Sequence, residues 1–408
     1  MAVNHTETST NSMKPIDDIL DFKNTKIAFA NKSDKELKKT AWLFSMMNRA
    51  WLVDALSPVG LLAIRWRLPF VKPIIKATIF EQFVGGTTLL DSQSSIQNLY
   101  HNNVVSVLDY SAEAKASEKD FNITMNENIR AIEFAQTNDS VPIIVSKISG
   151  LARFGLLEEI QKGDAFSRET RIEYRNVLKR IDSICHVAHE RNVGIFIDAE
   201  ESWIQDAIDH LAYVMMKRYN KEKVIVYNTF QMYRHDRLQF MMDMHEKAKQ
   251  EGFLLGAKIV RGAYMDKERE RAEEMGYPSP IQVNKEATDE AYNLALRYCI
   301  KNYKEIAICN ATHNAESSKL FAKLIHENNL PKDHPHLNFC QLYGMSDHLT
   351  FNLADAGFNV AKYLVYGQIE EVVPYLVRRA KENSSVTGDM SREYELVMTE
   401  VRRRGKEA

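Results

Sequence analysis

The alternation of short apolar runs with long amphipathic stretches constrains the fold of this chain more than any other feature. Eight runs rich in β-branched residues occur at 104–109, 142–147, 194–198, 223–230, 254–260, 306–312, 337–343 and 358–364. Helical spacing of apolar residues follows them at 120–137, 170–191, 201–219, 232–251, 284–303, 315–328, 346–355 and 368–383. Eight β–α units predict a parallel sheet covered by helices, which is the α/β fold of a (β/α)8 TIM-type barrel.

The remainder of the chain divides around this barrel. We expect a disordered tail at 1–14 and an N-terminal helical extension at 15–100, broken at prolines and glycines. The barrel occupies 101–388, and a charged tail follows at 389–408. An apolar content of 45% and a charged content of 26% are typical of a soluble globular protein.

Charge, cysteine content and the N-terminal sequence limit which partners and which cellular compartment we expect for this chain. A net charge of −2 gives no electrostatic basis for binding nucleic acid. The four cysteines form no CxxC pair and the N-terminus has no pattern of a secretory signal, which favours a reducing, cytoplasmic compartment. The apolar stretch 59–80 holds four basic residues and two prolines, so it predicts no spanning helix. It fits either peripheral contact with the inner face of a membrane or packing on the barrel.

Polar side chains stand at the predicted carboxyl end of every strand, where barrel proteins collect their chemistry. They are Asp109, Lys147, Asp198, Gln231, Lys258 with Arg261, Thr312 with His313, Gln341 with Tyr343, and Tyr363. One such carboxylate often only caps the next helix, but eight polar strand ends should converge on one mouth. Lys147 and Lys258 lie in apolar runs, where an unpaired ammonium is costly, so both are candidate functional residues.

The common cofactor motifs are missing from the sequence. It has no Gly-x-Gly-x-x-Gly turn, no Walker loop and no histidine spacing of a metal site, so no metal is expected. His313 fits a ligand contact and a satisfied, partly buried histidine equally well.

The helix expected at 368–383 carries an aromatic, two arginines and a carboxylate on one face. Tyr375, Arg378, Arg379 and Glu382 are spaced i, i+3, i+4 and i+7. Adjacent guanidiniums can grip a carboxylate bidentately. A solvated charged face is the simpler interpretation of an Arg-Arg pair.

Six ordered motifs over about 100–388 resemble the proline dehydrogenase family. They are Lys-Ile-Ser-Gly at 147–150, Asp-Ala-Glu-Glu at 198–201, Thr-Phe-Gln-x-Tyr at 229–233, Lys-Ile-Val-Arg-Gly-Ala-Tyr at 258–264, Ala-Thr-His-Asn at 311–314, and Tyr363 followed by Arg378-Arg379-x-x-Glu382-Asn383. The resemblance implies a flavoenzyme that oxidises L-proline to Δ1-pyrroline-5-carboxylate by hydride transfer to FAD and passes electrons to a quinone, the first step of proline catabolism. It also implies that the last barrel helix lies across the mouth.

The resemblance implies a role for each matched residue. The catalytic group would be Lys147, Asp198 and Tyr363, with Asp198 orienting Tyr363 or Lys147. Substrate contacts would come from Lys147, Ile259, Tyr363, Tyr375, Arg378, Arg379 and Glu382, and FAD contacts from Gln231, Lys258, Val260, Arg261, Gly262, Tyr264, Thr312 and His313. Lys258 stands where bifunctional members carry arginine, but it keeps the positive charge beside the flavin. The chain looks monofunctional, because it ends too soon for a second dehydrogenase domain.

Two other functions fit parts of the pattern. A Schiff-base lyase would use Lys147 or Lys258 as its nucleophilic amine, but it leaves the paired arginines unexplained. A non-catalytic interaction protein on the same barrel would show no flavin chemistry. Within the resemblance, the bulk of Tyr363 predicts that proline is preferred over hydroxyproline.

Overall fold

The computed structural model describes residues 15–49, 71–111, 116–163, 167–385 and 389–407, with only the backbone described at 71, 380–385 and 389–390. The tail expected at 1–14 and most of the basic apolar stretch at 59–80 lie outside the described residues.

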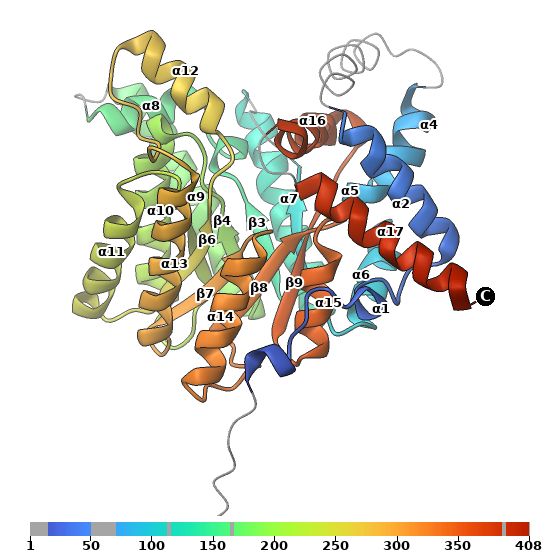
Figure 1. Ribbon diagram of the computed structural model, residues 1–408. Coiled ribbons are helices and arrows are strands. Elements are labelled where there is room, and N and C mark those ends of the chain that lie inside the picture. The colour runs from blue at the N-terminus through green and yellow to red at the C-terminus, as the bar shows by residue number, and fades with distance from the viewer. Residues whose placement is uncertain (1–14, 50–70, 112–115, 164–166, 386–388, 408) are drawn as a thin grey trace, which may run out of the picture.

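Eight parallel strands close into the barrel that the sequence predicts (Figure 1). They are β2 (Val105–Tyr110), β3 (Ile143–Ser146), β4 (Gly194–Ile197), β5 (Val226–Gln231), β6 (Leu255–Val260), β7 (Ile306–Ala311), β8 (Leu337–Leu342) and β9 (Asn359–Tyr366). Neighbours in sequence are neighbours in the sheet, and β9 pairs with both β8 and β2, which closes the ring. All eight expected runs therefore form strands of a (β/α)8 barrel.

Helices follow the strands and form an outer layer. They are α7 (Glu118–Gln136), α9 (Arg168–Arg191), α10 (Ser202–Tyr219), α11 (Arg237–Glu251), α13 (Lys285–Lys301), α14 (Ala315–Glu327) and α15 (Asp347–Asp355). Three elements add to the expected set, namely η3 (Ile148–Gly150), α8 (Phe154–Lys162) and α12 (Met265–Met275). Alternate strand side chains fill the barrel interior or pack against the helices, so the described residues form two hydrophobic cores.

The described part of the N-terminal extension is mainly helical. It contains η1 (Ile16–Asp18), α1 (Thr25–Ala28), α2 (Asp34–Met47), α4 (Val71–Ile75), the π-helix η2 (Lys76–Phe80), α5 (Glu81–Phe83), the short strand β1 (Val84–Gly86) and α6 (Gln93–Tyr100). A capping box between Ser33 and Glu36 starts α2. β1 adds to the sheet beside β9, while α6 packs Ile96 and Leu99 into the outer core next to β2.

The charged tail expected at 389–408 is instead helix α17 (Asp389–Glu407), which packs against α2. Its Glu400 accepts a hydrogen bond from Thr25 and pairs with Arg403 and Arg404. A charged helix can pack in this way because its buried carboxylates are paired and its Val397 is fully buried.

The last barrel helix, α16 (Ile369–Ser385), leaves the outer layer. Figure 1 shows it at the end of the barrel where α8 and α12 also lie, rather than upright beside α14. The chain turns after β9 at Gly367, whose φ of 152° lies in a region that L side chains rarely adopt. The carboxyl ends of the strands and one face of α16 therefore meet.

Candidate active site

A cavity of about 410 Å³ lies at the carboxyl ends of the strands, under α16. Of the site residues named from the sequence, those that line it are Lys147, Asp198, Gln231, Lys258, Val260, Arg261, Gly262, Tyr264, Thr312, His313, Tyr363, Tyr375, Arg378 and Arg379. Polar strand ends from every side of the barrel thus meet at one mouth.

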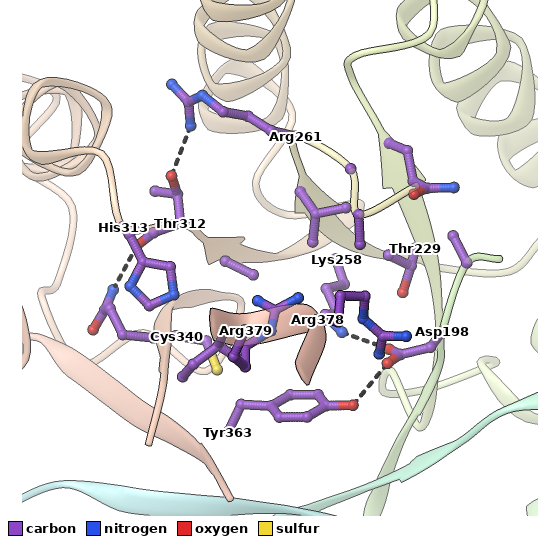
Figure 2. A pocket seen from close by; sticks show the side chains of 18 of the residues that line it. Asp198, Thr229, Lys258, Arg261, Thr312, His313, Cys340, Tyr363, Arg378 and Arg379 are labelled. Carbon is purple, nitrogen blue, oxygen red and sulfur yellow. Dashed lines mark hydrogen bonds and ion pairs between the residues drawn. The ribbon is translucent and has the colours of Figure 1, made fainter. Parts of the chain in front are cut away.

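Asp198 joins two of these side chains inside the barrel (Figure 2). Its Oδ1 lies 2.5 Å from Lys258 Nζ, and its Oδ2 accepts a hydrogen bond of 2.8 Å from the Tyr363 hydroxyl. Burial raises the pKa of Asp198, but Lys258 and Lys147 outweigh it and hold that pKa below its ordinary value. Burial beside Asp109 and Asp198 raises the pKa of Tyr363, so this phenol stays protonated and donates.

The second buried lysine has a carboxylate of its own. Lys147 Nζ lies 2.7 Å from Asp109 Oδ2 at the neighbouring strand end. Burial and the nearby Asp198 raise the pKa of Asp109, while Lys147 opposes the rise. Asp198 therefore hydrogen-bonds Tyr363 and Lys258, whereas Lys147 is held by Asp109. Sequence reasoning noted Asp109 as a strand end but gave it no role in the site.

Helix α16 supplies the upper wall of the cavity. The Arg378 guanidinium lies 5.6 Å from the ring centre of Tyr264, and that of Arg379 lies 5.6 Å from the ring centre of Tyr375. Figure 2 shows both arginine side chains among the residues that line the cavity. Their face of the helix therefore points into the barrel mouth and is not a solvated charged face. The side chain of Glu382 lies outside those that the structure describes.

Arg261 is fixed on the opposite side of the cavity. Its guanidinium donates to Asp289, Thr312 and Ser317 at 2.7, 2.7 and 3.0 Å. Gly262 follows with a φ of 141°, and a Cβ there would meet the Tyr233 ring at 2.5 Å. A side chain at this position would therefore collide with Tyr233, and the backbone after β6 can follow this path only with glycine.

Among the predicted site residues with described side chains, Ile259 does not line the cavity. It is fully buried in the outer core, between the barrel wall and the helices, and does not line the cavity. Successive side chains of a strand point to opposite faces, so the inward position of Lys258 forces Ile259 outward.

His313 is neutral at the edge of the cavity. Burial, and then the charges of Lys362 and Arg379, lower its pKa to about 3. Its Nδ1 lies 2.8 Å from Ser346 Oγ. Arg392, on α17, also lines the cavity, although the sequence places it in a charged tail. The helical spacing of Tyr394, Val397 and Val401 is the signal that identifies this helix.

Two kinds of feature are absent from the described residues. They contain no group of three or more His, Cys, Asp or Glu side chains that could hold a metal ion. No described helix is both long and apolar enough to cross a membrane.

The sequence is similar to known proteins over most of its length. A family model described as proline dehydrogenase matches residues 92–392. The chain is 30% identical to a mitochondrial proline dehydrogenase 1 of Dictyostelium discoideum, over 94% of this chain and 75% of that protein. It is 32% identical to a carbapenem antibiotics biosynthesis protein of Pectobacterium carotovorum subsp. carotovorum, over 79% of this chain and 83% of that protein.

Other relatives are longer than the part that matches. A mitochondrial proline dehydrogenase 1 of Drosophila melanogaster is 39% identical over 57% of this chain, but the match spans only 35% of that protein. The crystal structure of proline utilization A from Bdellovibrio bacteriovorus has the same fold, with a TM-score of 0.70 at 20% identity, over 88% of this chain and 38% of that one. The family model covers most of the present sequence, and this chain therefore belongs to the proline dehydrogenase family.

Proposed function

We propose that this chain oxidises L-proline to Δ1-pyrroline-5-carboxylate with FAD as the hydride acceptor, the first step of proline catabolism. One observation carries the proposal. Helix α16 lies over the barrel mouth and brings Arg378 and Arg379 into the same cavity as the Lys258–Asp198–Tyr363 unit. The two guanidiniums thus face the hydrogen-bonded Lys258–Asp198–Tyr363 unit across a cavity large enough for a ligand.

The two arginines are suited to a small carboxylate. Each guanidinium is planar and can donate two parallel hydrogen bonds. Tyr264 and Tyr375 lie beside them and limit where the forks can point. Because Lys147 is paired with Asp109 below, it adds less charge to the clamp than an isolated lysine would. We assign the proline carboxylate to Arg378 and Arg379.

Tyr363 would set the position of the proline ring. Its hydroxyl is tied to Asp198 at 2.8 Å and its ring is buried, so the phenol cannot swing aside. A substituent on the ring carbon that faces Tyr363 would collide with it. This fixed wall supports a preference for proline over hydroxyproline.

The cavity is lined mainly by positive charges, which suit the negative phosphates of a bound dinucleotide. Among its described lining residues, seven are Lys or Arg and two are Asp, so cations outnumber carboxylates. We propose that FAD is held by Gln231, Lys258, Val260, Arg261, Gly262, Tyr264, Thr312 and His313. When bound, FAD would supply the hydride acceptor, while the protein orients the carbon next to the ring nitrogen and keeps water away.

The electron acceptor and the compartment belong to the proposal as well. We infer that a membrane quinone reoxidises the flavin and that the protein acts in the cytoplasm or on the inner face of a membrane. The described end of the basic stretch supports a surface role, since Ile74 on α4 is 62% exposed and lies between Lys72 and Lys76.

The pairing of both buried lysines disfavours the Schiff-base alternative. A lysine must be a neutral amine to attack a carbonyl. Lys147 Nζ and Lys258 Nζ each form an ion pair with a buried carboxylate, so attack on a carbonyl would first have to break that pair. A yellow protein with a flavin spectrum would exclude this lyase.

The decisive experiment is anaerobic addition of L-proline to the full-length protein as purified. We expect the absorbance of the oxidised flavin to fall, because proline reduces the bound FAD. The variants Arg378→Ala and Arg379→Ala should need far more proline for the same bleaching. A flavin-containing protein that proline does not bleach would refute the proposal, and the non-catalytic alternative would then stand.

The name of the Pectobacterium relative raises a second metabolic setting. That protein is named for carbapenem antibiotics biosynthesis, and the match spans 83% of it. We favour catabolism, because relatives from Dictyostelium, Drosophila and Homo sapiens are named proline dehydrogenases. Deletion in a host that grows on proline as its nitrogen source would separate the two settings.

A further inference from the structure

A chain of three polar side chains runs from the cavity into the protein. His313 lines the cavity, and its Nδ1 lies 2.8 Å from Ser346 Oγ. Ser346 Oγ lies 3.1 Å from Glu393 Oε1, and the Ser346 backbone N–H donates to the same oxygen at 3.0 Å. Ser346 and Glu393 are buried. The three residues join the loop after β7, the start of α15 and helix α17.

Ser346, the middle residue of these three, is held in an unusual backbone conformation. Its φ of 51° lies in the left-handed region, which few residues other than glycine adopt. The ammonium of Lys362 fixes both neighbours of Ser346, because it donates to the carbonyl of Met345 and pairs with Asp347 at 2.9 Å. Such strained residues persist where their surroundings hold them firmly, and they cluster at functional sites. The hydroxyl therefore stays between its two partners.

We propose that Glu393, acting through Ser346, determines which ring nitrogen of His313 carries the proton. The Ser346 hydroxyl has one hydrogen and two acceptors beside it. An ionised Glu393 takes that hydrogen, so His313 must donate from Nδ1, and its Nε2 becomes an acceptor. A neutral Glu393 releases the hydrogen to Nδ1, and Nε2 then carries the proton as a donor.

The charges around Glu393 bring its titration close to neutral pH. Burial is the largest cause that raises its pKa, and Asp347 on α15 raises it further. Lys362 on β9 and Arg392 on α17 oppose the rise, which leaves the pKa of Glu393 at about 7. Both forms of this carboxyl are therefore populated under physiological conditions.

The neighbouring histidines do not change charge in the same range. His348 on α15 lies 3.5 Å from Glu393 Oε1, and burial next to Arg392 and Lys362 lowers its pKa to about 3. The pKa of His313 is lowered to about 3 as well. His313 thus changes tautomer and not charge when Glu393 titrates. Glu393 and Ser346 are positioning residues, and the hydrogen bond that they set faces the cavity.

A hydrogen bond between His313 Nε2 and FAD rests on the proposed function, but the tautomer of His313 can be measured without FAD chemistry. The experiment uses the full-length protein as purified, with 15N-labelled histidine, and long-range 1H–15N correlation between about pH 5.5 and 8.5, the range in which such switches act. We expect the Nε2 resonance of His313 to move from the protonated to the unprotonated position as the pH rises through about 7. A His313→Gln variant assigns the resonance.

Three variants decide the outcome. Glu393→Gln should keep Nε2 protonated at every pH, because the amide cannot ionise. Ser346→Gly, which tolerates the left-handed φ, should abolish the pH dependence even if Glu393→Gln fails to fold. Glu400→Gln removes another buried carboxylate of α17, which hydrogen-bonds Thr25 and not Ser346. This variant should show the same pH-dependent change of the His313 tautomer as the parent. A parental pH profile in Ser346→Gly, or a fixed tautomer in the parent, would overturn the inference.

The same samples separate this inference from the proposed function. Proline oxidation is followed by flavin bleaching, and the tautomer is followed by the histidine resonance. Loss of bleaching with an intact tautomer change would refute the function alone, and a fixed tautomer with intact bleaching would refute the inference alone.

Discussion

Replacing Asp198 by asparagine separates the charge of this residue from its hydrogen bond. Asp198 is buried, pairs with Lys258 at 2.5 Å and accepts from Tyr363 at 2.8 Å. Asparagine has nearly the same shape and keeps an acceptor for Tyr363. It removes the counter-charge of Lys258, whose side chain is only 6% exposed. Lys258 would then be a buried ammonium without its carboxylate.

The expected loss of stability follows from that unpaired charge. Removing one partner of a buried ion pair costs about 3–5 kcal/mol. Tyr363→Phe removes one hydrogen bond to a charged acceptor and costs about 1.5–3 kcal/mol. We therefore expect Asp198→Asn to lower the free energy of unfolding by about 2 kcal/mol more than Tyr363→Phe, from the difference of the two ranges.

The pH dependence gives a second check on Asp198. Burial raises its pKa, but Lys258 and Lys147 outweigh burial, so the pKa in the folded protein lies below that in the unfolded chain. A depressed carboxyl pKa contributes stability above the unfolded value of about 3.9 and loses it as the pH falls through the folded value. The difference between the parent and Asp198→Asn should therefore be constant near neutral pH and shrink below about pH 4.

Urea unfolding followed by circular dichroism measures these differences, with Tyr363→Phe as the matched control. The slope of the transition must stay the same for the comparison to hold. If Asp198→Asn proves no less stable than Tyr363→Phe at neutral pH, then Lys258 finds compensation elsewhere and the argument from an unpaired charge fails.

Three further outcomes test the clamp, the ring wall and the C-terminal helix. Arg378→Ala or Arg379→Ala should each raise the KM for proline about 10- to 100-fold, which is the loss of one charged hydrogen-bonding partner, with flavin retained by absorbance. Tyr363→Ser should lower the kcat/KM for proline and raise it for hydroxyproline, and equal use of both by the parent would contradict the wall. Glu400, whose pKa is lowered to about 2 by Arg403 and Arg404, stabilises the protein above about pH 4.5, so the Tm difference between the parent and Glu400→Gln should fall as the pH drops towards 2.

The barrel was predictable because its strands are short, apolar and evenly spaced. Buried parallel strands such as β6 leave an unbroken apolar run, and a polar residue near the end of the run marks the mouth. The same run does not reveal which residues face inward. Lys258 and Ile259 are adjacent, and the sequence supports an inward position for either, so the parity of the strand had to come from the structure.

Helix α17 escaped prediction for a different reason. Its last turns carry Arg402, Arg403 and Arg404, which predict exposure to water. Its buried face includes two carboxylates, Glu393 and Glu400, and buried carboxylates cannot be told from exposed ones without their partners. The partners come from residues distant in sequence, namely Ser346 for Glu393 and Thr25 for Glu400. The position of Arg392 in the cavity wall depends on these contacts.

The N-terminal extension and the displaced helix α16 depend on each other. In a regular barrel the last helix would cover the outer side of the first and last strands, here β2 and β9. Because α16 lies over the mouth, that side needs other cover, and α6 provides it for β2. The extension thus replaces the missing outer helix. It leaves α16 free to bring Arg378 and Arg379 to the cavity, so the segment before the barrel is a structural condition for the proposed carboxylate clamp.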